Sequence, residues 1–240
     1  ARAEPKGPMS SPASRPAGQG PVAAAIDLAA GLTERGEYAP AIEALKTVRE
    51  AGELDADWLL AWSGALERVG RYEAALEAAA EAGRLRPGDP EAVLARGRLL
   101  ETLGRKEEAV EAYRSVDRVA PSASGEVSAA DLVAMGRILD RYATLTGQRA
   151  SRQAANILHN YFQEAYQKID ESCWPAHIAA GQLLLDKHHA REAAQEFELA
   201  LKLRSDLPPA HVGLGAIHLA GWDFENCMKR VEAALKQNPR

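Results

Sequence analysis

The sequence predicts an all-α fold built as a solenoid, which is a stack of helix-turn-helix hairpins. Gly36, Gly70 and Gly104 lie 34 residues apart, and an alanine follows each of them by five residues. A fixed period in this range is typical of repeat arrays. The chain is 46% hydrophobic but only 5% aromatic, and it is rich in alanine, which favours close helix packing over a β-sheet core.

Each unit places one helix on either side of its glycine. The segments 23–34, 57–69 and 91–103 carry apolar residues at helical spacing and end where glycine can adopt a left-handed cap. The segments after the glycines show a second apolar stripe, which begins with Tyr38, Tyr72 and Ala109 in the three units. We therefore expect three consecutive hairpins with their turns at these glycines.

The next unit is predicted to be longer than the others. From Gly97 to Gly181 there are 84 residues, whereas two regular units would span 68. Ser128 and Asp131 form a capping signature at the start of its first helix. We expect its turn at residues 146–148 and its second helix over about residues 151–169.

Aromatic residues gather in this longer second helix, at Tyr161, Phe162 and Tyr166. The simpler interpretation is that the rings pack the added length against the neighbouring hairpins. The alternative is that the helix protrudes and serves as a docking edge or a self-association surface.

These residues resemble the tetratricopeptide repeat. The third unit carries the small, large, turn, aromatic and proline positions of that family in register, and the pattern returns from Trp174 and from Pro208. The matching residues of the third unit are Gly97, Leu100, Gly104, Ala109, Tyr113, Val116 and Pro121. The first two units have Ala29 and Ser63 where the first-helix glycine is expected, which keeps that position small.

The resemblance implies a right-handed α-solenoid of about six repeats, the fourth enlarged. The repeats would cover about residues 22–55, 56–89, 90–123, 124–173, 174–207 and 208–240. Residues 1–21 contain five prolines among Ser, Gly and Ala, which predicts a disordered lead-in.

The start of the chain leaves two compartments open. Ala1-Arg2-Ala3 is of the small-residue type found at a secretory cleavage site, which would indicate an exported or periplasmic protein. A chain end that falls within an alanine-rich linker of a cytoplasmic protein is the other interpretation.

Several classes of partner are disfavoured. The net charge of −5 and the lack of a basic run argue against nucleic acid, and no apolar stretch is long enough for a membrane span. Cys173 and Cys227 lie in different units without a CxxC spacing, so we expect neither a disulfide nor a cysteine metal site.

Catalytic and cofactor motifs are also not found, and we expect a protein that is not an enzyme and has no cofactor. No HExxH, GxSxG or P-loop pattern occurs. His177 and His211 are 34 residues apart and so share a slot on stacked helices, which makes a two-histidine metal site conceivable. No carboxylate accompanies either of them at ligand spacing, so we predict packing residues instead.

The resemblance directs the search for function to the concave surface lined by the first helices. Carried onto this chain, the groove positions are mostly apolar, with one central cation and one amide. They are Ile26, Leu60, Leu94, Arg98, Ile178, Gln182 and Val212. The charged groove that binds chaperone tails in this family needs lysine, asparagine and arginine here, and only Arg98 is present, so that activity is disfavoured.

We therefore expect a protein-protein interaction scaffold that presents an apolar groove to a peptide or helix of a partner. Two alternatives stay open at this stage. The array could be the repeat portion of a larger exported enzyme, such as a hydrolase or metalloprotease. It could also be an oligomerisation scaffold in which the enlarged repeat pairs with its own copy.

Overall fold

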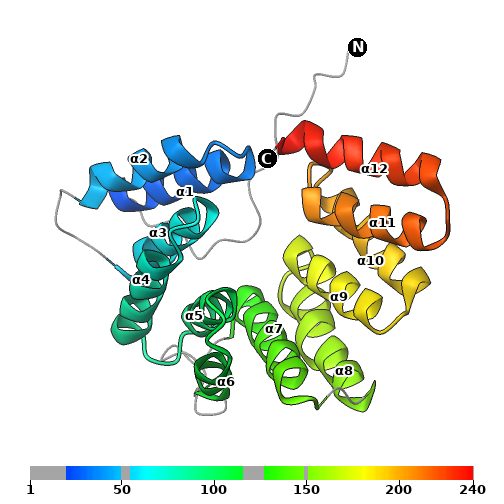
Figure 1. Ribbon diagram of the computed structural model, residues 1–240, viewed down its shortest axis with the longest axis horizontal. Coiled ribbons are helices and arrows are strands. Elements are labelled where there is room, and N and C mark those ends of the chain that lie inside the picture. Colours follow the sequence, from blue (N-terminus) through cyan, green and yellow to red (C-terminus); the bar gives the residue numbers. More distant parts are fainter. Residues whose placement is uncertain (1–19, 50–54, 116–126, 149–150, 240) are drawn as a thin grey trace.

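The computed structural model describes residues 20–49, 55–115, 127–148 and 151–239, and the regular structure in these ranges is entirely helical. Residues 1–19, most of the predicted lead-in, lie outside the described residues. The helices are, in chain order (Figure 1), α1 Pro21–Glu34, α2 Tyr38–Arg49, α3 Ala56–Arg68, α4 Tyr72–Leu85, α5 Pro90–Thr102, α6 Lys106–Arg114, α7 Ala129–Thr146, α8 Ser151–Ile157, α9 Trp174–Asp186, α10 Ala190–Leu203, α11 Pro208–Ala220 and α12 Phe224–Gln237. Two π-helical segments, η2 Leu158–Gln163 and η3 Ala165–Ile169, follow α8.

The helices form the predicted stack of hairpins. Each odd-numbered helix from α1 to α7 contacts the helix that follows it in the chain, and α9 pairs with α10 and α11 with α12. The first helices α1, α3, α5, α7, α9 and α11 also contact one another in succession, so they form one continuous row. The molecule is therefore an α-solenoid.

The turns adopt the conformation that the glycines predict. Gly36, Gly70 and Gly104 have φ of 75°, 76° and 73°, and Gly147 of the enlarged hairpin has φ of 76°. These values are accessible to glycine without strain. In the last two hairpins His188 and Trp222 adopt the equivalent conformation, with φ of 64° and 59°.

The two helices of a hairpin cross where a small residue faces an aromatic ring. A Cβ added at Gly97 would lie 2.1 Å from the Tyr113 ring, and one at Gly136 would lie 2.4 Å from the Phe162 ring. Ser63 occupies the equivalent place in the second hairpin, where its hydroxyl donates a hydrogen bond to the Ala75 carbonyl oxygen at 2.8 Å. The predicted small positions are therefore where the backbones approach most closely.

The enlarged hairpin follows the predicted bounds with one difference. The capping box at Ser128 and Asp131 is present, and the second helix spans residues 151–169 as expected. From Leu158 onward, however, that helix is π-helical, which the sequence pattern did not indicate. Phe162 is 1% exposed, and Tyr161 and Tyr166 pack against the same core cluster. The aromatic residues thus pack the added length, as in the simpler interpretation.

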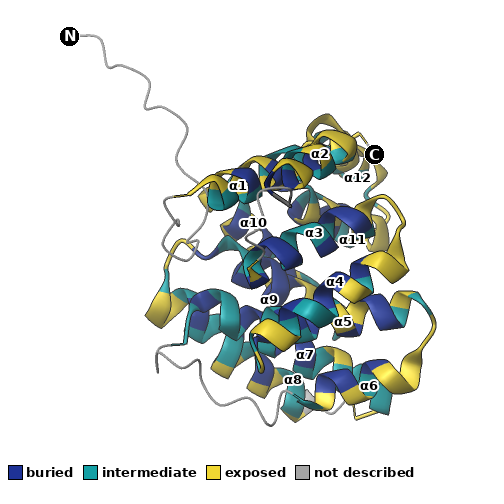
Figure 2. Ribbon diagram, turned by 90° about the vertical axis from the view of Figure 1, so that its left-hand side faces the viewer, coloured by how far each residue is buried: buried dark blue, intermediate teal, exposed yellow. Residues whose placement is uncertain are grey.

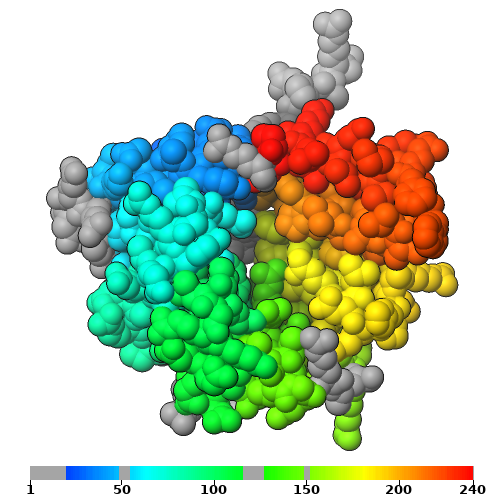
Figure 3. All heavy atoms as spheres, in the orientation of Figure 1, coloured from blue at the N-terminus to red at the C-terminus, as the bar shows by residue number. Residues whose placement is uncertain are grey.

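The array curls until its two ends meet, as Figures 1 and 2 show. Arg204 at the end of α10 donates hydrogen bonds of 2.9 and 2.6 Å to the carboxylate of Glu34 at the end of α1, 170 residues away. Asn238, just after α12, donates to the Tyr38 hydroxyl at 3.4 Å. In the space-filling view the two halves of the chain enclose a narrow central opening (Figure 3).

His177 is buried, as expected of a packing residue, but it has a partner that the sequence spacing did not indicate. A carboxylate does lie beside His177, because Glu196 of α10 is brought across the hairpin, with its Oε2 2.7 Å from the histidine Nδ1. Tyr166 stacks on the imidazole with the ring centroids 4.0 Å apart and donates to Glu196 at 3.2 Å. This trio links the fourth and fifth hairpins. Within the described ranges no group of three or more His, Cys, Asp or Glu is placed to hold a metal ion.

Candidate functional site

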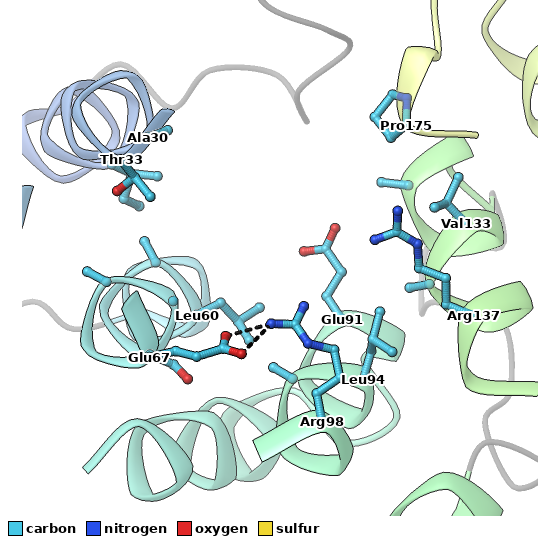
Figure 4. A pocket seen from close by; sticks show the side chains of 18 of the residues that line it. Ala30, Thr33, Leu60, Glu67, Glu91, Leu94, Arg98, Val133, Arg137 and Pro175 are labelled. Atoms are coloured by element: carbon cyan, nitrogen blue, oxygen red, sulfur yellow. Dashed lines mark hydrogen bonds and ion pairs between the residues drawn. The ribbon is translucent and has the colours of Figure 1, made fainter. Parts of the chain in front are cut away.

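The first helices of four successive hairpins line a cavity of about 560 Å³ inside the ring (Figure 4). Its walls come from α1, α3, α5 and α7, and the segment that leads into α9 closes one side. The apolar and small part of the lining is Ile26, Ala29, Ala30, Leu60, Ala61, Gly64, Ala65, Leu94, Ala95, Ala129, Ala130, Val133, Ala134, Cys173 and Pro175. The charged part is Glu34, Glu67, Arg68, Glu91, Arg98, Arg137 and Asp170.

The structure brings four of the seven predicted groove residues together in this cavity: Ile26, Leu60, Leu94 and Arg98. Ile178 is instead 2% exposed and packs in the core cluster that contains Phe197. Its helix, α9, has neighbours on several sides, since it contacts α7, α10, α11 and η2.

The other two predicted groove residues do not line the cavity either. Gln182 is exposed, and Val212 of α11 is 59% exposed. A role for any of the seven residues in binding stays a prediction, but the cavity defines which of them can act together.

Arg98 is neutralised from the preceding hairpin. Its guanidinium donates hydrogen bonds of 2.7 and 2.6 Å to the two carboxylate oxygens of Glu67 on α3 (Figure 4). Both bonds come from Nη2, and this charge-assisted pair holds Arg98 against one wall of the cavity. The single central charge expected from the sequence is therefore already paired.

A second arginine, Arg137 on α7, also extends into the cavity (Figure 4). Among the residues that the structure describes, none accepts a hydrogen bond from its Nε, which is buried. Burial lowers the pKa of this guanidinium, and the charge of Arg98 lowers it further. Arginine nevertheless stays protonated in proteins, so the cavity contains a positive charge whose Nε has no hydrogen-bond partner among the described residues.

Two polar groups stand where the chain enters α9. Asp170 accepts hydrogen bonds at one carboxylate oxygen from the backbone and hydroxyl of Ser172, at 2.9 and 2.7 Å. Its other oxygen, Oδ2, is buried and has no hydrogen-bond partner within the described part of the chain. Burial raises the pKa of the Cys173 thiol, which keeps it protonated.

Sequence reasoning missed Arg137, although a signal for it was present. Arg98 directly follows Gly97, the crossing residue of the third hairpin, and Arg137 directly follows Gly136, the crossing residue of the fourth. The two arginines therefore occupy equivalent places on stacked helices. The irregular length of the fourth unit hid this correspondence, because a strict 34-residue spacing does not connect them.

Comparison with known proteins agrees with the fold. The TPR protein TTC0263 of Thermus thermophilus is 22% identical, with a TM-score of 0.56 over 77% of this chain and 92% of that one. The human IFIT1 dimer is 14% identical, with a TM-score of 0.61 over 90% of this chain and 50% of that one. These likenesses define the chain as an α-solenoid of helical hairpins.

A family model for the tetratricopeptide repeat matches residues 26–90 and 60–124. The repeats within residues 26–124 are therefore tetratricopeptide repeats. A search of curated proteins gives no match. Proteins of this family generally act as scaffolds for protein-protein interactions and are generally not enzymes. Within the described ranges no helix is long and apolar enough to cross a membrane.

Proposed function

We propose that this protein is an interaction module that holds a short segment of a partner protein inside its ring. The cavity supports this proposal, because its about 560 Å³ falls within the usual range of about 300–1,000 Å³ for ligand sites. Its mixture of apolar walls and a few charged groups is also the usual composition of such sites.

The size of the cavity favours an extended segment over a helix. A helix with its side chains is about 10–12 Å across, so one turn would fill most of the cavity. An extended segment needs less width and can place alternate side chains against the apolar residues of α1, α3 and α5. We therefore narrow the expected ligand to a few residues of extended peptide.

The lining does not favour catalysis. None of the residues that the structure describes around the cavity is a histidine, so Cys173 has no imidazole base there. Its raised thiol pKa also works against a thiolate nucleophile. These features support binding without chemistry as the role of the cavity.

The lining also disfavours a polyanionic ligand. The human IFIT1 structure is described with PPP-AAAA, but the cavity here contains four acidic and three basic residues. A triphosphate would therefore be repelled on balance.

The test uses a cavity-filling variant and a matched control on the same helix. Peptides would be selected on the protein from a random phage-displayed library, and their dissociation constants measured by fluorescence anisotropy. Ala30→Trp places an indole in the cavity without altering the core, and we expect it to weaken binding at least tenfold. Ala24→Trp is exposed on α1 outside the cavity and should leave binding unchanged. Equal binding by both variants would contradict the proposal.

A second candidate function is self-association through the last hairpin. Trp222 is 79% exposed, and Phe224, Met228 and Leu235 are each more than half exposed. Exposed apolar residues gathered in this way often mark a contact surface. Light scattering of the wild type and of a Trp222→Ser, Phe224→Ser double variant over a range of concentrations would test it. A mass that stays monomeric at every concentration would exclude this candidate.

A further inference from the structure

Helix α12 carries an apolar stripe that is exposed to solvent. Its members lie at intervals of four, three and four residues and therefore share one face of the helix. They are Phe224, Met228, Val231 and Leu235. The helix packs against α11 through another face, where a Cβ on Gly215 of α11 would lie 3.6 Å from the Arg230 Cβ. The stripe thus faces solvent at the outer edge of the ring (Figure 1).

The matching face of α10 shows how such a stripe is used inside the array. The residues that lie 34 positions before the last three members of the stripe are Ala194, Phe197 and Leu201. They belong to the apolar cluster that also contains Ala210 and Leu214 of α11. In α10 this face is therefore covered by a helix. The α12 stripe has the same positions on its helix, so a helix is also the occupant that fits it.

The sequence order of charges beside the stripe indicates which helix this is. An exposed row on the side away from Gly215 alternates in sign and consists of Glu225, Lys229, Glu232 and Lys236. A second copy of the helix that lies antiparallel sets Glu225 opposite Lys236 and Lys229 opposite Glu232. A parallel copy would set like charges opposite each other. The row is therefore complementary to itself in the antiparallel direction.

We propose that α12 pairs with α12 of a second copy of this chain, antiparallel and about a two-fold axis. This inference rests on the second candidate function, self-association through the last hairpin, and it adds the geometry of the contact. The axis passes between residues 230 and 231, which is the midpoint of both facing charge pairs. Because the contact has two-fold symmetry, each pair occurs twice.

Trp222 extends the contact beyond the stripe. It occupies the turn position that glycine has in the first hairpins, with φ of 59°, a conformation that is strained for a bulky residue. Its ring meets the Phe224 ring edge to face, with the centroids 6.0 Å apart, and 79% of the residue is exposed. In the antiparallel register residue 222 lies opposite residue 239 of the second copy. The indole therefore covers the end of the second copy's helix.

The first test measures self-association and its surface. A contact made by one hairpin of each copy is at the small end of specific interfaces, below about 1,200 Å² in total, so we expect a reversible dimer. Sedimentation equilibrium of the whole chain at several concentrations gives its dissociation constant. Met228→Glu places a charge within the stripe and should weaken the dimer at least about tenfold. Leu28→Glu is the matched control, since Leu28 is equally exposed on α1 and should leave the dimer unchanged.

The second test compares two double variants that have the same net charge. Glu225→Lys with Lys236→Glu reverses a facing pair, so opposite charges still meet at every contact and the dissociation constant should stay within about twofold of wild type. Glu225→Lys with Lys229→Glu sets like charges opposite each other at all four contacts and should weaken the dimer at least about fivefold at low salt. Circular dichroism of both variants checks that α12 is still folded.

The outcomes separate the pairing geometry from the candidate function on which it rests. A wild type that stays monomeric at every concentration overturns both, and a helix of a different protein is then the remaining occupant of the stripe. A dimer that Met228→Glu does not weaken uses another surface and also overturns both. If Met228→Glu weakens the dimer but the two double variants behave alike, self-association through the last hairpin stands and the antiparallel pairing is wrong.

Discussion

The third and fourth hairpins solve the same packing problem but differ in the charge that they present to the cavity. Gly97 faces Tyr113 in one, and Gly136 faces Phe162 in the other. The arginine after each glycine extends into the cavity, and Arg98 in the third hairpin binds a carboxylate, whereas the Nε of Arg137 in the fourth has no partner among the described residues. Packing is therefore repeated from unit to unit, whereas charge pairing shifts by one helical turn. A repeat array can thus change the charge that it presents to the cavity without altering its core.

The largest effect on the free energy of unfolding should come from the glycine–aromatic packing that the two hairpins share. Gly97→Ala and Gly136→Ala would each force a methyl group into a buried aromatic ring, and overpacking of this kind costs about 1–3 kcal/mol. Gly64→Ala is the control, because no atom lies within 4 Å of the added Cβ. Removing a helix-interior glycine there should stabilise the fold by about 0.5–1 kcal/mol. Urea denaturation measures all three, and a neutral Gly136→Ala would show that the fourth crossing differs from the third.

The next largest effect on stability should distinguish the ion pair of Glu101 from that of Glu67. Glu101 is 13% exposed and binds both Arg141 and Tyr113, whereas Glu67 is 23% exposed and binds Arg98 alone. The hydrogen bond between Arg141 and Glu101 raises the pKa of the Arg141 guanidinium. Double-mutant cycles with Glu101→Gln and Arg141→Met should give a coupling of about 1 kcal/mol, and the Glu67–Arg98 cycle less. Equal coupling energies for the two pairs, measured by thermal denaturation, would show that the two ion pairs do not differ in strength.

A smaller effect would make the third hairpin resemble the fourth. Glu67→Gln releases Arg98 from its carboxylate, so the cavity would become more positively charged. We expect acidic peptides to bind this variant about threefold to tenfold more tightly, which corresponds to roughly 0.7–1.4 kcal/mol. Glu73→Gln, on the exposed face of α4, is the control. Tighter binding of neutral peptides by the same factor would show that charge is not the cause.

Most of the fold could be predicted from the sequence, because each turn and crossing depends on residues within one unit. The left-handed glycines, the capping box at Ser128 and the bounds of the enlarged hairpin all follow from local rules. The sequence pattern did not indicate the π-helical turns from Leu158. The carboxylate beside His177 was also missed, because Glu196 lies 19 residues away on the other helix of the same hairpin. The site was predicted only in part, because it lies between hairpins. Arg98 was found by its position, but its pairing with Glu67, and the place of Arg137 in the cavity, depend on how the units stack.

The smallest effect concerns the contact that joins the two ends of the ring. Arg204 binds Glu34 and lies over the Trp174 ring at 5.3 Å, but the Glu34 side chain is 48% exposed. Water screens such a pair, so Arg204→Ala should lower stability by less than about 1 kcal/mol. Lys202→Ala, an exposed change on the same helix, serves as the control. Neighbouring hairpins are joined by buried apolar clusters, and we expect the curvature of this stack to bring the two ends together. The radius of gyration of Arg204→Ala in small-angle scattering should therefore equal that of the wild type. An expanded particle for Arg204→Ala alone would show instead that this end contact closes the ring and maintains the cavity.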